Sequence, residues 1–207
     1  KSPLQASLRY GTYNTKDVNV NNTLASKTLN YQGFYNYYTT DGYSIRPNSN
    51  NRITTPINRL TTSQQFKWNL NSNASILLNT RITDETIKSN IAVSNGGVTI
   101  NSNGNEHNTD ANLSATLNYH FTANLKTSFR SYLTNYISKQ DLLTLLGAPY
   151  NDLLNHLFKR IENQTDWAVG KNLNSIFGIG AVWEGVKSSR YDSEKVRKSN
   201  NTSLNVS

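Results

Sequence analysis

The chain alternates apolar and polar residues along much of its length. In "LSATLNYHFTANLKTSF", residues 113–129, apolar side chains occupy every second position up to Phe121, and the pattern resumes after a short polar break. A helix repeats about every 3.6 residues and cannot use period-two spacing, whereas successive side chains of a strand point to opposite faces of a sheet. The stretch therefore predicts a β-hairpin with one apolar and one polar face.

The same alternation recurs in other parts of the chain. It is clear at residues 4–11, 29–38, 66–83 and 165–185, and in the last of these "KNLN" is the predicted tight turn. Runs of this kind separated by small polar residues are typical of antiparallel hairpins. We predict about ten strands over the whole chain.

Short and long connections alternate between the predicted strands. "NSNAS", "TAN" and "KNLN" are short turns, whereas residues 44–60, 84–108 and 139–162 are long and mostly polar. Connections this long are uncommon in compact domains unless they serve a function, so we predict three long loops. Leucines with helical spacing surround Gly147 and Pro149 and predict one or two short helices in the third loop.

Long strands with short turns at one end and long loops at the other are typical of an outer-membrane β-barrel. Each arm of the hairpin at 113–129 is about as long as the roughly 9 to 11 residues that a tilted strand needs to cross a bilayer. Aromatic residues near strand ends would lie at the membrane interface, where their rings are favoured: Tyr37, Tyr38, Tyr119, Phe121, Trp167 and Trp183. The same aromatics would also fit the core of a soluble β-sandwich, so the alternation leaves both folds open.

Composition narrows the choice of partner and compartment. There is no cysteine among the 207 residues, which excludes disulfides, cysteine-ligated zinc and thiol nucleophiles. No apolar run reaches the roughly 18 residues of a membrane-spanning helix. The net charge of +8 is spread along the chain, with one dense stretch, "SEKVRKS" at residues 193–199, which we interpret as a solvated loop. Because the basic residues are scattered, nucleic acid is not an expected partner.

No catalytic or metal-binding constellation stands out. His107, His120 and His156 are far apart, and none has a second histidine or a carboxylate at ligand spacing. Asp84 and Glu85 are adjacent, and neighbours on a strand point to opposite faces, so we interpret them as solvated loop residues rather than paired catalytic carboxylates. The sequence predicts neither an enzyme nor a bound metal.

Two glycine pairs, in "SNGGV" and "FGIGA", lack the Lys-Ser/Thr ending and the strand-to-helix context of a phosphate-binding loop. Glycine inside a strand often marks a close approach of a ligand or another backbone. We therefore predict that Gly178 and Gly180 lie on the inner side of a strand.

Several motifs, in order, resemble the TonB-dependent outer-membrane receptors, in the part of the barrel that follows the plug. "SLRYGTYNT" at 7–15 looks like the first barrel strand, and "NYQGFYNYYTTDGYSIRPNSNNR" at 30–52 is similar to the third strand and its exit. Asp41-Gly42-Tyr43 is the most specific element of this resemblance. The hairpins at 64–86, 113–136 and 165–185 then resemble the successive hairpins of the family.

The resemblance implies an all-β fold, an antiparallel up-and-down transmembrane β-barrel with long loops on one side. Because such barrels close about 22 strands around a plug, residues 1–207 are expected to form a single partial barrel of about ten strands. The chain starts at Lys1 without Met and without a plug, so we expect it to be a fragment of a larger receptor.

The function implied is non-enzymatic import of a scarce nutrient, such as a ferric chelate, cobalamin or a glycan, across the bacterial outer membrane. The implied partners are outer-membrane lipid, the plug domain of the parent chain, TonB and the small nutrient ligand, with no cofactor. Two alternatives remain open: a soluble or surface-attached β-sheet module that binds glycans or proteins, and a small complete outer-membrane barrel.

In a barrel the polar face would be the lumen. Five residues on that face are the candidate ligand-binding residues: Asn79, Arg81, Arg130, Tyr132 and Tyr136. Arginine offers paired donors to an anion, and tyrosine offers a flat stacking surface. The alternative is that these side chains hydrogen-bond a plug or fill the lumen.

Overall fold

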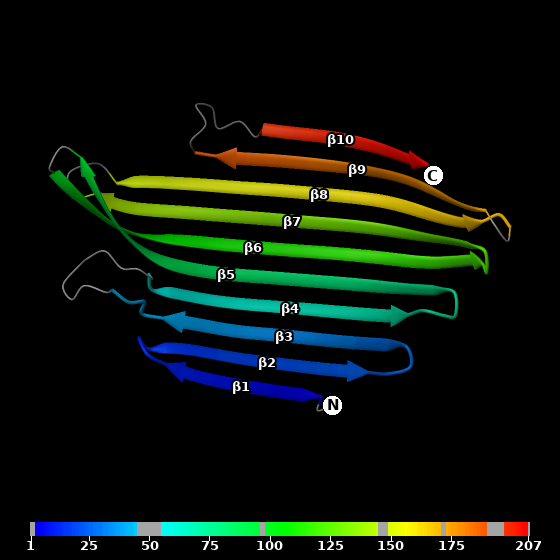
Figure 1. The fold of residues 1–207 in the computed structure, drawn as a ribbon, viewed down its shortest axis with the longest axis horizontal. Coiled ribbons are helices and arrows are strands. Elements are labelled where there is room, and N and C mark those ends of the chain that lie inside the picture. The colour runs from blue at the N-terminus through cyan, green and yellow to red at the C-terminus, as the bar shows by residue number, and fades with distance from the viewer. Residues whose placement is uncertain are drawn as a thin grey trace.

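The computed structural model describes residues 3–44, 55–95, 98–144, 149–170, 173–189 and 197–206, and these form one antiparallel sheet (Figure 1). The ten strands lie side by side in sequence order, so every connection is a hairpin and the predicted number of strands is confirmed. The strands are β1 (Leu4–Gly11), β2 (Thr15–Ala25), β3 (Leu29–Thr40), β4 (Ile57–Asn69), β5 (Ala74–Asn95), β6 (Val98–Thr122), β7 (Leu125–Thr144), β8 (Tyr150–Ala168), β9 (Asn174–Ser188) and β10 (Arg197–Val206).

The hairpin predicted from residues 113–129 is confirmed as β6 and β7. Leu117 lies opposite Phe129 in the register, and the two strands are joined at residues 123–124. The register shifts between His120 and Thr122, directly before this turn. The hairpin at 165–185 is also confirmed as β8 and β9, although Lys171 and Asn172 of "KNLN" lie outside the described residues.

Connections 26–28, 70–73, 123–124 and 169–173 all lie at one end of the sheet, on the right in Figure 1. The strand ends that lead into the other connections lie at the opposite end, on the left. One of these connections is the β1–β2 turn at residues 12–14, in which Tyr13 and Asn14 have positive φ. Positive φ at both central residues is what a tight type I′ hairpin requires.

The loop predicted at residues 84–108 is wrong, because β5 and β6 continue through most of it. Lys88 pairs with Asn105 and Val93 pairs with Ile100, whereas β4 stops pairing with β5 at Ile87. Residues 88–105 therefore extend beyond β4; we call them the β5–β6 extension. Asn, Ser and Gly are depleted in ordinary strands, so their abundance here concealed a strand pairing that the composition disfavours.

The short helices predicted at residues 139–162 are also wrong. β7 reaches Thr144 and β8 begins at Tyr150, with residues 145–148 outside the described part. Leu153 and Leu157 are four residues apart, a spacing that suits one face of a helix and equally one face of a strand. Leu154 and Phe158 repeat it on the opposite face, so the periodicity was ambiguous.

No helix in the described ranges has the length and apolar character needed to span a membrane. For the loop predicted at 44–60, β4 already begins at Ile57, and residues 45–54 lie outside the described residues.

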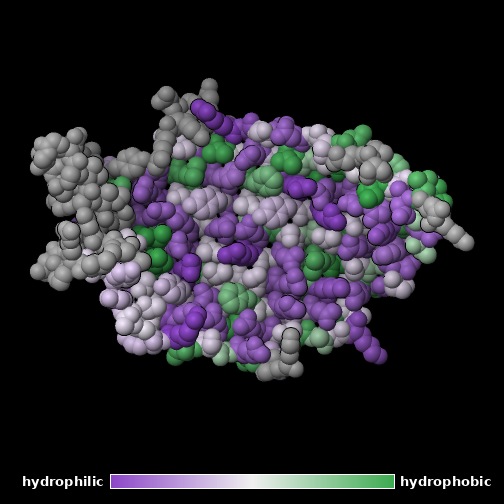
Figure 2. Space-filling view, viewed as in Figure 1, coloured by the Kyte–Doolittle hydropathy of each residue, from purple (hydrophilic) through white to green (hydrophobic). Residues whose placement is uncertain are grey.

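The register sorts the side chains into two faces. One, the polar face, carries Asn79, Ser114, Tyr132 and Arg160 in register across four strands. The other, the apolar face, carries the residues one position away on each strand. One side of the sheet is mainly hydrophilic in Figure 2. Exposed large side chains on the apolar face include Leu8, Leu60, Trp68, Leu117, Phe129, Ile161 and Trp183.

The sheet is a single layer with no packed core. Ala74 is the one buried hydrophobic residue in the described part of the chain. β1 and β10 lie at opposite edges of the sheet and do not pair with each other within the described residues, so this chain does not close a complete ten-stranded barrel. The architecture is that of a partial β-barrel wall.

Most of the predicted interfacial aromatics lie on the apolar face. Tyr119 packs edge-on against Phe121 with ring centroids 4.7 Å apart, near the turn end of the sheet. Tyr38 is an exception, because it lies on the polar face, where the Arg59 guanidinium stands 5.4 Å from its ring centroid. Its neighbour Tyr37 lies on the apolar face, as expected for an interfacial aromatic residue.

The Asp41-Gly42-Tyr43 motif fastens the exit of β3 to the β1–β2 turn. Tyr43 stacks on Tyr13 with ring centroids 5.1 Å apart, and the Asp41 amide donates to the Tyr13 carbonyl at 2.9 Å. Gly42 has a φ of 67°, a conformation that glycine adopts without strain. The chain direction after β3 therefore depends on this glycine.

Candidate ligand-binding face

All five predicted ligand-binding residues lie on the polar face. Asn79 and Arg81 come from β5, and Arg130, Tyr132 and Tyr136 come from β7. β6 lies between the two strands and contributes Ser114, which pairs with both Asn79 and Tyr132. Strand alternation alone directs these side chains to the same side, as the sequence predicted.

The two candidates on β5 differ in their surroundings. Asn79 accepts a hydrogen bond from Gln65 at 2.8 Å and donates one to the Ser114 hydroxyl at 3.2 Å, so it links β4 to β6. Arg81 is exposed and makes no hydrogen bond or ion pair with another residue in the described part of the chain. Its charge is therefore available to a ligand or to another domain.

The two tyrosines on β7 are held by neighbouring amides. The Tyr132 hydroxyl donates to Asn112 at 2.8 Å, and its ring meets Phe158 edge-on at 6.0 Å. The Tyr136 hydroxyl donates to Asn108 at 3.2 Å. With its hydroxyl engaged, Tyr132 still exposes 40% of its surface and can offer a ring face for stacking.

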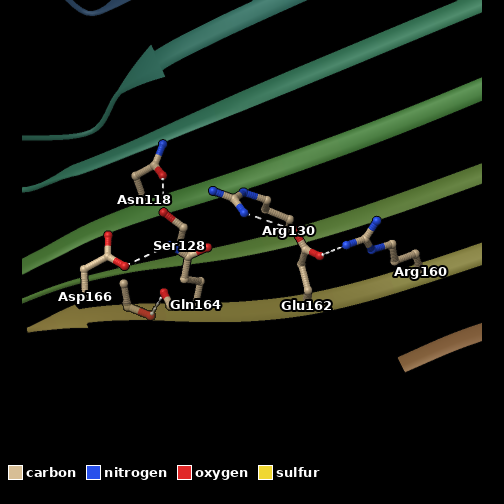
Figure 3. A network of polar contacts seen from close by, with 8 residues as sticks. Asn118, Ser128, Arg130, Arg160, Glu162, Gln164 and Asp166 are labelled. Atoms are coloured by element: carbon tan, nitrogen blue, oxygen red, sulfur yellow. Dashed lines mark hydrogen bonds and ion pairs between the residues drawn. The ribbon is translucent and has the colours of Figure 1, made fainter. Parts of the chain in front are cut away.

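Arg130 belongs to a charged triad that spans β7 and β8 (Figure 3). Its guanidinium donates to one carboxylate oxygen of Glu162 at 3.0 Å, and Arg160 donates to the other oxygen. The triad carries two positive charges and one negative charge, so it can attract an anion without leaving either arginine unpaired in its absence. The sequence interpretation missed Arg160 and Glu162 because residues 139–162 were assigned to a loop with helices.

Two shallow grooves border this triad. One, of about 280 Å³, is lined by Ser114, Thr116, Tyr132 and Phe158 in addition to the triad. The other, of about 340 Å³, lies over Gly178 and Gly180. Both glycines are on the polar face, in register with Gln164 and Glu162, as predicted. A Cβ on Gly180 would lie 3.3 Å from the Ser203 hydroxyl and 3.6 Å from Glu162 Cβ, so the glycine keeps the approach to Glu162 open.

The polar network continues from the triad towards the end of the sheet that carries the turn at residues 123–124. Ser128 donates to Asn118 at 2.7 Å, and Gln164 donates to Asp166 at 2.8 Å (Figure 3). Lys126 forms an ion pair with Asp166 at 3.3 Å. Charges on this part of the polar face are therefore mostly matched by an opposite charge on the neighbouring strand.

Folding brings a carboxylate to two of the histidines, which the sequence spacing did not show. His156 lies 2.7 Å from Glu184 on the polar face, and His107 lies 3.2 Å from Asp84 on the apolar face. Asp84 and Glu85 do point to opposite faces, but they belong to β5 and not to a loop. No group of three or more His, Cys, Asp or Glu gathers in a metal-binding arrangement within the described residues.

No protein-family model matches this chain, and no curated protein matches it either. Solved structures do. The ferric preacinetobactin receptor BauA of Acinetobacter baumannii matches with a TM-score of 0.56 at 8% identity, over 93% of this chain and 36% of that protein. The ferric yersiniabactin uptake receptor FyuA of Yersinia pestis matches with a TM-score of 0.50 at 12% identity, over 98% and 37%. The copper transporter OprC gives 0.46 at 11% identity, over 98% and 41%.

The fold of this chain is a partial β-barrel wall, and it matches part of BauA and part of FyuA. At these identities the likeness concerns the fold, and this chain spans a little over one third of the length of BauA and FyuA. The resemblance to TonB-dependent receptors that the motifs indicated is thus confirmed for the architecture.

Proposed function

We propose that this chain is part of the barrel of a TonB-dependent outer-membrane receptor that imports a scarce nutrient, and that a ferric chelate is the first nutrient to test. One observation carries the proposal: a single-layer sheet exposes large apolar side chains on one face and polar, ion-paired side chains on the other. Such a sheet suits two different solvents, lipid outside and water or a plug inside.

The dimensions of the apolar face suit a bilayer. Trp183 pairs with Lys159, which precedes Trp167 by eight residues on β8. Eight residues span about 27 Å along a strand, or about 20 Å across the membrane at a tilt of about 40°. The apolar band of an outer-membrane barrel is about 25 Å tall, with aromatic girdles at both edges. Trp167 and Trp183 are placed to mark those edges.

The polar face suits an anionic ligand. Arg81 has no partner within the described residues, and Arg130 and Arg160 share a single carboxylate. Arginine pairs strongly with carboxylates and other planar oxyanions. BauA and FyuA, which share the fold, are named for ferric compounds, and this supports a ferric chelate ahead of cobalamin or a glycan.

The proposed function requires a bacterial outer membrane, a plug domain against the polar face, and TonB to supply energy. An exposed apolar face disfavours the soluble binding module, because contiguous apolar patches of this kind are rare on monomeric soluble proteins.

The test is uptake of radiolabelled ferric chelates by iron-starved cells whose own receptors have been deleted and which express the protein. We expect the double variant Arg130→Gln, Arg160→Gln to weaken apparent affinity by about tenfold or more, because Glu162 would then repel an anion. The control is Arg9→Gln, which removes an arginine paired with Asp17 on the same face of β1 and should leave uptake unchanged.

If the double variant and the control took up the ferric chelate equally well, the triad would have no part in binding the ligand. If the unmodified protein took up no ferric chelate, cobalamin or glycan, the transport proposal itself would be wrong.

A further inference from the structure

A groove of about 800 Å³ lies on the apolar face between β8, β9 and β10. Lys159, Lys187 and Lys198 line it, one from each strand, together with Trp183. Gly185 forms its floor, because it lies in register between Leu157 and Lys198 and has no side chain to fill the space. The groove therefore brings together three cations on the face that otherwise carries leucine, isoleucine and tryptophan.

The lysines lie at the level of Trp183 and beyond it. Lys159 is level with Trp183, Lys198 pairs with Gly185 two residues further along β9, and Lys187 follows two residues later. This direction leads to the end of the sheet opposite the short turns. In a membrane-spanning wall, a cation just beyond the aromatic girdle lies at the depth of the lipid headgroups.

None of the three lysines makes an ion pair or hydrogen bond with another residue in the described part of the chain. Glu184 also borders the groove, but its carboxylate bonds His156 on the polar face. On the polar face, by contrast, Lys126 is paired with Asp166. Uncompensated charges next to hydrocarbon are costly, so a cluster of three calls for an anion from outside the chain.

We propose that this groove binds the phosphate-bearing headgroup of an outer-leaflet lipid, with an acyl chain against Leu157 and Trp183. Lysine binds phosphate as a point charge, and the side-chain amides of Asn135, Asn155 and Asn200 line the same groove and add hydrogen-bond donors. The inference rests on the membrane placement in the proposed function. It also gives a role to Lys198, which the sequence alone placed in a solvated basic loop.

The test uses the full chain folded in detergent micelles that contain either bis-phosphorylated lipid A or the same lipid without its phosphates, with bound lipid counted by native mass spectrometry. We expect retention of the phosphorylated form only. The triple variant Lys159→Gln, Lys187→Gln, Lys198→Gln should bind it about 100-fold more weakly, since each lysine near an anionic surface contributes about fivefold.

The matched control, Lys27→Gln, Lys67→Gln, Lys88→Gln, removes the same charge away from the groove and should bind like the unmodified protein. The triple Lys→Arg variant of the groove keeps the charge and should retain the lipid, which separates charge loss from misfolding. Equal binding of both lipids, or competition by millimolar inorganic phosphate as strong as that by lipid A, would overturn the proposal. A protein that folds as a monomer without detergent would instead refute the proposed function, while folding in detergent without lipid binding would refute this inference alone.

Discussion

At the scale of single residues, Gly33 shows how the apolar face tolerates polar atoms. It is buried on β3, and the Tyr31 side chain lies across it to donate a hydrogen bond to Gln64. The Tyr31 ring also packs on Phe66 with centroids 4.8 Å apart. Placing an aromatic ring over a strand glycine covers its backbone and pins the register of the strands. The glycine thus stabilises a polar cluster within the apolar wall.

Replacing Gly33 by alanine should lower the free energy of unfolding by about 1–3 kcal/mol, the usual cost of overpacking. A Cβ there would clash with the Asn22 amide oxygen and the Tyr31 hydroxyl, so both side chains would have to move. Urea unfolding in detergent, followed by circular dichroism, measures the effect. Gly11→Ala is the control, because its nearest neighbour would be Thr15 Cβ at 3.8 Å, and it should be neutral or slightly stabilising. Equal stability of the two variants would contradict this role of Gly33.

The residues of the candidate site were predictable only where the strand was predictable. Arg130 and Tyr132 follow a clear alternation, so their shared face could be read from the sequence, and the structure places them there. Arg160 and Glu162 also alternate with Ile161, which shares a face with Trp167. The leucines that precede them at residues 153–157 suggested a helix and obscured this alternation. Pairings across strands, such as that of Arg130 with Glu162, depend on register, which a single sequence does not fix.

At the scale of elements, the sequence predicted the strands that have one apolar and one polar face. It missed the first half of β8, which carries apolar residues on both faces, and the β5–β6 extension, which is rich in Asn, Ser and Gly. The abundance of Asn, Ser and Gly in the β5–β6 extension led us to predict a loop, yet its backbone is paired from Lys88–Asn105 to Asn95–Val98. Two antiparallel strands can continue past a neighbouring strand, because their backbone N–H and C=O groups still bond each other. This pairing does not depend on the identity of the side chains. Backbone pairing has no sequence pattern of its own, so it could not be predicted.

Trimming the β5–β6 extension tests whether it takes part in ligand capture. Replacing residues 89–104 by Asn-Gly would place the turn between Lys88 and Asn105, which are already partners in the register. We expect the free energy of unfolding to change by only about 1 kcal/mol, because β4 pairs with β5 only as far as Ile87 and, of the replaced residues, only 102–104 pair with β7. Uptake of the ferric chelate should fall by about tenfold or more, because long loops of outer-membrane barrels face outwards. Unchanged uptake by the trimmed, folded protein would exclude the extension from ligand capture.

At the scale of the whole molecule, the fold has no interior of its own. Its stability comes from strand pairing and from what lies against each face, because Ala74 is the one buried hydrophobic residue in the described ranges. The two sides should therefore respond differently to the same substitution.

Leu77 and Leu78 are adjacent on β5 and provide this comparison directly. Leu77 pairs with Lys67 on the polar face, and Leu78 pairs with Phe66 on the apolar face. Leu78→Arg should destabilise the protein in phospholipid vesicles by about 2 kcal/mol, whereas Leu77→Arg should cost less than about 1 kcal/mol. Urea unfolding from the vesicles measures both. If Leu77→Arg were the more damaging variant, the assignment of the lipid-facing side would be reversed.

The register irregularity between His120 and Thr122 lies beside a turn, where a slip affects little of the strand. In the middle of a strand, one inserted residue would transfer every later side chain to the opposite face, from lipid to water or the reverse, while two inserted residues would restore the original order. Over evolutionary time, changes in the length of these strands are therefore constrained to pairs of codons. The connections at the end opposite the short turns can grow or shrink one residue at a time.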